Sequence, residues 1–219
     1  MVKLNITGNL YLKRDPKKYS PTYINVLHVQ LSAIFNYAVT YYRLPSNPAK
    51  LAGGIGKTKA HAMKFWTIGQ FNQFISSFPA DSTEYLVFNL LFYTGMRSGE
   101  LLALTLADFY EKEKSIHVNK TYSRLYKKDI VTSPKTEKGN RVILLPQFIV
   151  DMLADYINRL PYIKQNERIF PCSKFWLFRH MKLGCKLSGA EQIRIHDLRH
   201  SHASLLIEMV FSPLLIKER

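Results

Sequence analysis

Two short motifs, far apart in the sequence, most constrain what this chain can fold into. The first is Y-T-G-M-R-S-G-E-L-L-A-L at residues 93–104, and the second is I-H-D-L-R-H-S-H-A-S at residues 195–204. In a helix, the spacing of His196 and Arg199 places both side chains on one face, where they can converge on one small anion. Arg97, in the first motif, would add a second planar fork of donors. A fold that brings these three groups together would grip a phosphate and stabilise its charge as it changes.

The overall charge also indicates a phosphate-bearing partner. The chain has 31 Lys and Arg against 16 Asp and Glu, a formal net charge of +15 at pH 7. An excess of this size in a folded chain indicates attraction to nucleic acid. Its apolar runs are too short or too interrupted to span a bilayer, and no signal segment opens the chain. We therefore expect a cytoplasmic protein that binds nucleic acid and not a membrane.

The cysteines argue against a metal site. Cys172 and Cys185 form no C-x-x-C pair and have no suitably spaced histidines. This pattern predicts reduced thiols and no structural zinc. No motif for a cofactor is found either, so we expect neither a metal nor a cofactor.

The apolar pattern predicts a fold that is mainly α with a small antiparallel β-sheet, in the α+β class. Ser20 and Pro21 form a helix start, and apolar residues recur at helical spacing until about Arg43. Further helices are predicted over residues 68–77, 82–94, 98–104, 147–159, 173–187 and 196–210, with another starting at Ser212-Pro213. Period-2 alternation predicts strands at 115–118, 121–126 and 141–145, with a turn at Gly139-Asn140.

The same pattern divides the chain into three parts. Residues 1–48 form a helical unit with little core of its own, 49–66 form a basic linker, and 67–219 form the main domain. The main domain begins at Thr67, which together with Gln70 forms a capping box. The linker is either a solvated connector or a segment that also follows a phosphate backbone.

Three motifs, taken in order, resemble those of the tyrosine recombinases, specifically the phage and mobile-element integrase branch. They are T-G-M-R-S-G-E-L at 94–101, the lysine of S-P-K-T at 133–136, and H-D-L-R-H-S-H-A-S at 196–204. The resemblance runs from about Thr67 to the C-terminal end, and the first helix is similar to the last helix of the family's core-binding domain. It implies a tyrosine recombinase-like catalytic domain behind the remnant of a helical core-binding domain.

This resemblance implies a function and a set of catalytic residues. The function is that of a site-specific DNA recombinase or integrase, which breaks and rejoins strands through a 3′-phosphotyrosyl intermediate. Arg97 and Arg199 would hold the non-bridging oxygens of the scissile phosphate, and His196 would hydrogen-bond or transfer a proton. Lys135 would protonate the leaving 5′ oxygen. No metal is needed, because these cations supply the positive charge.

Two of these assignments keep alternatives. The alternative for Lys135 is an ordinary exposed hairpin lysine, and Lys138 lies close to it in the sequence. Glu100, one helical turn after Arg97, would either orient the arginines or belong to the domain core.

Further basic residues are candidates for contacts with double-stranded DNA. They are Lys57, Lys59, Lys64, Lys120, Arg124, Lys138, Arg141 and His202. The alternative for His202 is a packing role in the fold. By the resemblance, the other partners would be further protomers in a DNA-bound tetramer.

One part of the family's pattern is missing. The nucleophilic tyrosine of the family follows the H-x-x-R motif, whereas no tyrosine follows Tyr162 in this sequence. We therefore expect a chain that is inactive as it stands. The resemblance also implies an arm-binding domain and more core-binding helices than residues 1–43 can hold, so we expect the chain to be incomplete at both ends. Two alternatives remain open: a non-catalytic relative that occupies DNA sites, and a type IB topoisomerase-like enzyme that relaxes supercoils.

Overall fold

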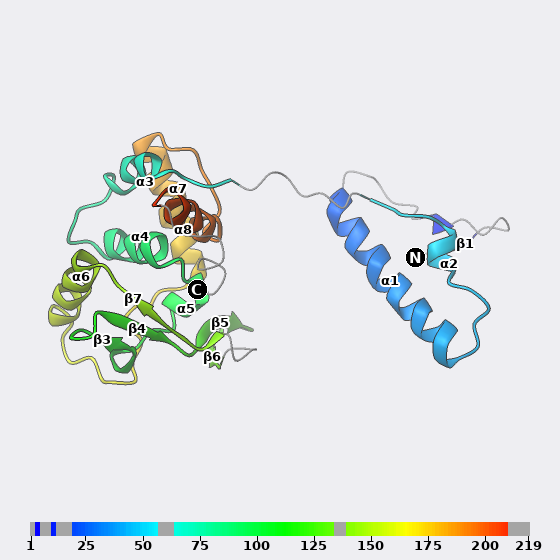
Figure 1. Ribbon diagram of the computed structural model, residues 1–219, viewed down its shortest axis with the longest axis horizontal. Helices are drawn as coiled ribbons and strands as arrows, with labels where there is room; N and C mark the ends of the chain where they lie inside the picture. The colour runs from blue at the N-terminus through cyan, green and yellow to red at the C-terminus, as the bar shows by residue number, and fades with distance from the viewer. Residues whose placement is uncertain (1–2, 5–9, 12–18, 57–63, 134–138, 210–219) are drawn as a thin grey trace. The chain divides into compact units, whose positions relative to one another are not determined.

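The chain divides into two compact units, Met1–Ala62 and Met63–Arg219. The computed structural model, drawn in Figure 1, describes residues 3–4, 10–11, 19–56, 64–133 and 139–209. The division between the units falls inside the predicted linker. The predicted helix start at Ser212-Pro213 lies outside the described residues.

The first unit is built on one long helix. Its elements are the antiparallel strands β1 (Lys3–Leu4) and β2 (Leu10–Tyr11) and the helices α1 (Pro21–Tyr41) and α2 (Pro48–Leu51). The Ser20 hydroxyl accepts a hydrogen bond from the backbone N–H of Tyr23, which caps α1 as the sequence predicts. No side chain of α1 is buried, in agreement with a unit that has little core.

Helix α2 begins at Pro48, the last residue of the predicted first unit, and continues into the predicted linker, where the sequence indicated a flexible connector. The Asn47 side chain explains it, because its Oδ1 accepts from the backbone N–H groups of Ala49 and Lys50. Its amide also donates to the carbonyl oxygen of Ser32 at 2.9 Å and to Oδ1 of Asn36 at 2.8 Å. One asparagine therefore both caps α2 and ties it to α1.

The second unit contains the main hydrophobic core. Its helices are α3 (Ile68–Ile75), α4 (Thr83–Thr94), α5 (Ser98–Leu101), α6 (Gln147–Asn158), α7 (Lys174–Ser188) and α8 (Asp197–Glu208), with a 3-10 turn at Leu106–Asp108. Helix α4 is central and packs against α3, α5, α6 and α8 (Figure 1). The stacked rings of Phe71 and Phe92, with centroids 3.9 Å apart, join α3 to α4.

The strands form two separate sheets where the sequence analysis expected one. Strands β3 (Phe109–Tyr110), β4 (Ser115–Val118) and β7 (Arg141–Leu144) form an antiparallel sheet in the order β3-β4-β7. Strands β5 (Thr121–Leu125) and β6 (Lys128–Thr132) form a hairpin of their own.

The hairpin turn explains why the sequence analysis missed β6. Tyr126 and Lys127 occupy the turn with φ angles of 49° and 64°, so a turn that usually takes Asn or Gly is made by two other residues. The predicted turn at Gly139-Asn140 instead precedes β7, which pairs with β4.

Gly95 allows α4 to end directly against α8. It terminates α4 in the left-handed conformation, with φ of 61°. A Cβ at this position would lie 2.5 Å from Cδ2 of His202, which is buried in α8. Its carbonyl oxygen accepts a hydrogen bond of 2.7 Å from Nη1 of Arg199. The glycine of the first motif therefore fixes where the second motif packs.

We predict that Gly95→Ala lowers the stability of the second unit by more than the cost of placing an alanine in a left-handed backbone conformation. The backbone effect is about 1 kcal/mol, and the clash with His202 adds about 1–3 kcal/mol of overpacking. Denaturant unfolding of both proteins measures the difference.

Gly189→Ala is the matched control, because Gly189 caps α7 with φ of 72° but a Cβ there would meet no atom closer than 3.8 Å. Equal losses of stability in the two variants would contradict the close approach of His202 to Gly95.

Candidate active site

Three arginines from distant parts of the sequence lie close to one carboxylate. Arg97 caps the N-terminus of α5, Arg141 begins β7, and Arg199 lies in the first turns of α8. The carboxylate is Glu100 of α5. The sequence predicts Arg97 and Arg199 at one site, and the structure brings them together.

Glu100 accepts hydrogen bonds from two of the arginines. Its side chain is only 7% exposed. Its two oxygens accept from the backbone N–H of Arg97 at 2.8 Å, from Nη1 of Arg97 at 2.9 Å, and from Nη1 and Nη2 of Arg141 at 3.2 and 2.9 Å. Burial alone would raise the pKa of Glu100, but these hydrogen bonds outweigh burial and lower it. The carboxylate is therefore charged at neutral pH.

Arg199 completes the cluster without bonding to Glu100. The structure directs its guanidinium toward the end of α4 through the bond to the Gly95 carbonyl. Burial lowers the pKa of Arg199, and the nearby charges of Arg97 and Arg141 lower it further. The group still carries its charge at neutral pH, because arginine starts from a very high value. Three positive charges against one negative charge leave two in excess.

His196 stands beside the arginines at the start of α8. Partial burial of the ring lowers its pKa first, followed by the neighbouring His200, and Arg199 and Arg97 contribute in the same direction. The imidazole is therefore mostly neutral at pH 7, with one nitrogen to donate and one to accept.

A buried aspartate fixes the start of α8. Asp197 accepts from the backbone N–H of Arg194 at 3.0 Å and from its guanidinium Nη2 at 2.8 Å. This pairing closes the turn before the helix, so His196 and Arg199 leave α8 in defined directions. The arrangement is that of an anion site with a neutral hydrogen-bonding group at its edge.

Four of the predicted site residues lie outside the described residues. They are Lys57, Lys59, Lys135 and Lys138.

Other predicted DNA contacts have acidic neighbours in the fold. Lys64 pairs with Glu191. Nζ of Lys120 lies 2.6 Å from Oδ1 of the buried Asp108. Nε of Arg124, which is more exposed, lies 3.6 Å from Asp129. The charge of Lys120 is balanced by its pair with Asp108 inside the protein, whereas Arg124 keeps more than half of its side chain exposed to solvent.

Two predicted DNA contacts occupy interior positions. His202 is buried between α8 and α4, with Nδ1 2.9 Å from the carbonyl oxygen of Phe92, so its side chain does not fit the expected contact with DNA. Arg141 is 14% exposed and directs its fork at Glu100. No local pattern predicts this pairing, because strand β7 and helix α5 meet only in the tertiary fold.

Sequence reasoning also missed the exposed face of α7. This face combines basic residues with aromatic and aliphatic ones: Lys174, Phe175, Phe178, Arg179, Lys182, Leu183, Lys186 and Leu187. At its N-terminal end, Cε of Lys174 lies 3.8 Å from where a Cβ on Gly99 of α5 would be. A basic helical face with exposed rings therefore begins beside the arginine cluster.

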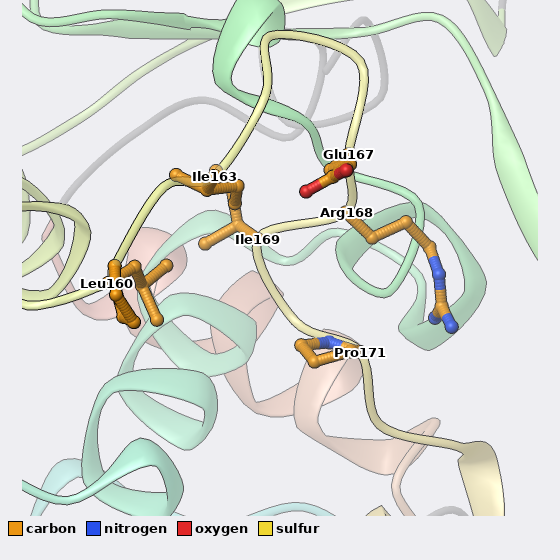
Figure 2. A pocket seen from close by; sticks show the side chains of 7 residues that line it. Leu160, Ile163, Glu167, Arg168, Ile169 and Pro171 are labelled. Carbon is orange, nitrogen blue, oxygen red and sulfur yellow. The ribbon is translucent and has the colours of Figure 1, made fainter.

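A separate apolar hollow of about 350 Å³ lies between the end of α6 and the start of α7. Leu160, Ile163, Ile169 and Pro171 line it, and the Arg168 guanidinium points away from it (Figure 2). The arginine cluster is not part of this hollow. Among the residues that the structure describes, no group of His, Cys, Asp and Glu is arranged to hold a metal ion. No helix in the same ranges is long and apolar enough to cross a membrane.

Comparisons with known sequences agree on the family that this chain is similar to. The sequence model of the phage integrase family matches residues 62–219. The chain is 33% identical over 211 residues to the ICEBs1 integrase of Bacillus subtilis strain 168, covering 90% of this chain and 57% of that protein. It is 26% identical over 183 residues to a putative prophage phiRv2 integrase of Mycobacterium tuberculosis, covering 80% of this chain and 48% of that protein. The chain thus spans about half the length of these curated relatives.

A solved structure shares the fold. The integrase of the Tn1549 transposon, in complex with a circular intermediate DNA, superposes with a TM-score of 0.76 at 21% identity, covering 92% of this chain and 72% of that one. The expected fold class, mainly α with small antiparallel sheets, is confirmed.

We predict that the pKa of His196 lies below the ordinary value of about 6.5 and rises when phosphate binds. A bound anion offsets the arginine charges that disfavour the imidazolium. Proton NMR of the histidine ring resonances against pH, with and without phosphate at constant ionic strength, measures both values. A His196 pKa that phosphate leaves unchanged would contradict the placement of this ring beside the anion site.

Proposed function

Because the chain belongs to the phage integrase family, we propose that it is the DNA-binding and catalytic portion of a site-specific recombinase that integrates or excises a mobile element. The family match confirms the resemblance to tyrosine recombinases that the motifs indicate. The observation that carries the proposal is the convergence of Arg97 and Arg199 beside His196, with more positive than negative charge at the site.

In this proposal the arginine cluster binds the scissile phosphate. Arg97 and Arg199 donate to the non-bridging oxygens and offset the charge that grows on the pentacoordinate transition state. His196, held mostly neutral, hydrogen-bonds the same phosphate or relays a proton. Lys135 protonates the leaving 5′ oxygen. The cations take the place that a divalent metal has in many nucleases, so the reaction needs no metal.

The nucleophile that attacks the scissile phosphate is not one of these residues. No tyrosine follows Tyr162 in this sequence, so the chain as it stands binds DNA without attaching to it covalently. Strand exchange takes place in the cytoplasm, with the protomers assembled as a tetramer on DNA. A non-catalytic relative that only occupies DNA sites would bind DNA in the same way. The gene sequence downstream of this segment, which shows whether a nucleophilic tyrosine is encoded, would distinguish this function from that of a recombinase.

The family match favours this function over a type IB topoisomerase-like enzyme. The two differ in sequence choice, because a topoisomerase of that type relaxes any supercoiled DNA.

We predict that the chain binds a labelled duplex carrying the attachment site of its own element, and that Arg97→Ala with Arg199→Ala weakens this binding. Each lost charge-assisted hydrogen bond to phosphate removes about 1.5–3 kcal/mol before compensation, so the double variant loses at least tenfold in affinity. Fluorescence anisotropy at several salt concentrations measures the affinity and its salt slope, which becomes shallower when phosphate contacts are lost.

Arg159→Ala is the control. Arg159 follows the last residue of α6, and its guanidinium donates to the carbonyl oxygen of Asp81 and not to a residue of the arginine cluster. An affinity indifferent both to salt and to the double substitution would contradict the proposed function.

We also predict that the basic face of α7 contacts the DNA next to the cleavage site. Lys182→Glu with Lys186→Glu replaces two exposed cations by anions and should reduce affinity by more than tenfold while leaving the melting temperature within a few degrees. The same anisotropy assay, paired with a thermal melt, measures both. Exposed Lys112→Glu with Lys114→Glu, in the turn before β4, is the matched charge control. An equal loss of affinity in both pairs would show a general charge effect and contradict a contact by α7.

A further inference from the structure

We infer that Arg141 is a positioning residue: it occupies the Glu100 carboxylate so that Arg97 keeps its guanidinium available for phosphate. This inference rests on the proposed function, and it replaces the direct DNA contact that the sequence analysis expected of Arg141.

The donors of Arg141 face the interior of the protein. Nη1 and Nη2 each donate to one oxygen of Glu100, in the parallel fork that arginine forms with carboxylates. Nε is buried and has no hydrogen-bond partner among the described residues. With the side chain 14% exposed, the guanidinium has little surface to offer a DNA backbone.

Arg97 is held much more loosely on the same carboxylate. Its guanidinium donates to Glu100 through Nη1 alone, and its side chain is 57% exposed. Its remaining guanidinium donors are therefore accessible to a ligand. The two arginines therefore have different roles. Arg141 neutralises the buried charge of Glu100, and Arg97 remains accessible to a ligand.

Removing Arg141 would change this division. Glu100, whose side chain is 7% exposed in the unmodified chain, would keep one cationic partner, and an incompletely paired buried carboxylate is costly. Arg97 is already in contact and would close its own fork on Glu100. The positive charge and the N–H donors of Arg97, which the proposed function needs for binding phosphate, would then pair with Glu100 inside the protein.

The fold makes Arg141 suited to this role. It begins β7 and is paired in register with Val118 of β4, so its backbone belongs to a three-stranded sheet. Its reach to α5 is therefore fixed by the sheet and does not depend on bound DNA. Lysine at this position would keep the charge but could not form the fork.

The test uses inorganic phosphate as the probe and the full chain. Phosphate is titrated at constant ionic strength and binding is followed by phosphorus NMR, with circular dichroism checking that each variant is folded. We expect Arg141→Met to bind phosphate about tenfold more weakly than the unmodified chain, because Arg97 is withdrawn. Arg141→Lys should lie between the two.

The decisive variant combines Arg141→Met with Glu100→Gln. It removes the carboxylate that would capture Arg97, so phosphate affinity should return to within about threefold of the unmodified chain, less than 1 kcal/mol by the relation of affinity to free energy. It also removes the unpaired buried charge, so it remains testable where the single variant fails to fold. If Arg141 touched phosphate directly, the combined variant would stay as weak as Arg141→Met, and the inference would be overturned.

The outcomes for the two proposals are separable. Phosphate titration needs no DNA, so an unmodified chain that binds phosphate but shows no salt-sensitive DNA binding would contradict the proposed function alone. A combined variant that stays weak while DNA binding by the unmodified chain is normal would contradict the role of Arg141 alone. An unmodified chain that binds no phosphate would overturn both.

Discussion

The pairing of one buried carboxylate with two arginines is the interaction on which the rest of the site depends. Three guanidinium groups near one another repel, and among the residues that the structure describes Glu100 is the carboxylate that balances part of that charge. A buried carboxylate of this kind is stable only when its partners stay in place. The cluster therefore needs α5, β7 and α8 assembled together, and once assembled it keeps a positive excess that suits a phosphate diester.

Close packing of backbone against backbone brings these elements together, and two glycines permit it. Gly95 ends α4 against His202 of α8, as described above. Gly99 does the same on the other side of the site, because a Cβ there would lie 2.5 Å from the hydroxyl of Thr121 and 2.9 Å from the Tyr122 carbonyl oxygen of β5. The T-G-M-R-S-G-E-L motif thus carries the charged groups together with two glycines: Gly95, before Arg97, lets α8 approach, and Gly99, between Arg97 and Glu100, lets the β5-β6 hairpin approach.

Local signals in the sequence predicted the helices and half of the site. Ser20, Thr67, Ser82 and Ser173 each cap a helix near the predicted start, because capping is a short-range interaction. The motifs likewise placed Arg97 and Arg199 at one site. Arg141 was given a different role, because its partner is set by how β7 packs on α5. The hairpin turn at Tyr126-Lys127 was missed, since neither residue is one that favours a left-handed backbone.

The basic composition of the chain overstates how many cations are available to DNA. Arg168 shows why: its guanidinium donates to the carbonyl oxygens of Leu102, Phe170 and Cys172, pairs with Asp129, and lies over the Tyr122 ring. It joins three segments of the fold and has 18% of its side chain exposed.

Lys120 and Arg141 are similarly used within the protein, whereas Arg97 touches a carboxylate and still has most of its side chain exposed. In the function that we propose, the cation that binds the DNA phosphate is therefore distinguished less by its place in a basic sequence than by a second cation that pairs with the nearest carboxylate. That condition is met at Glu100.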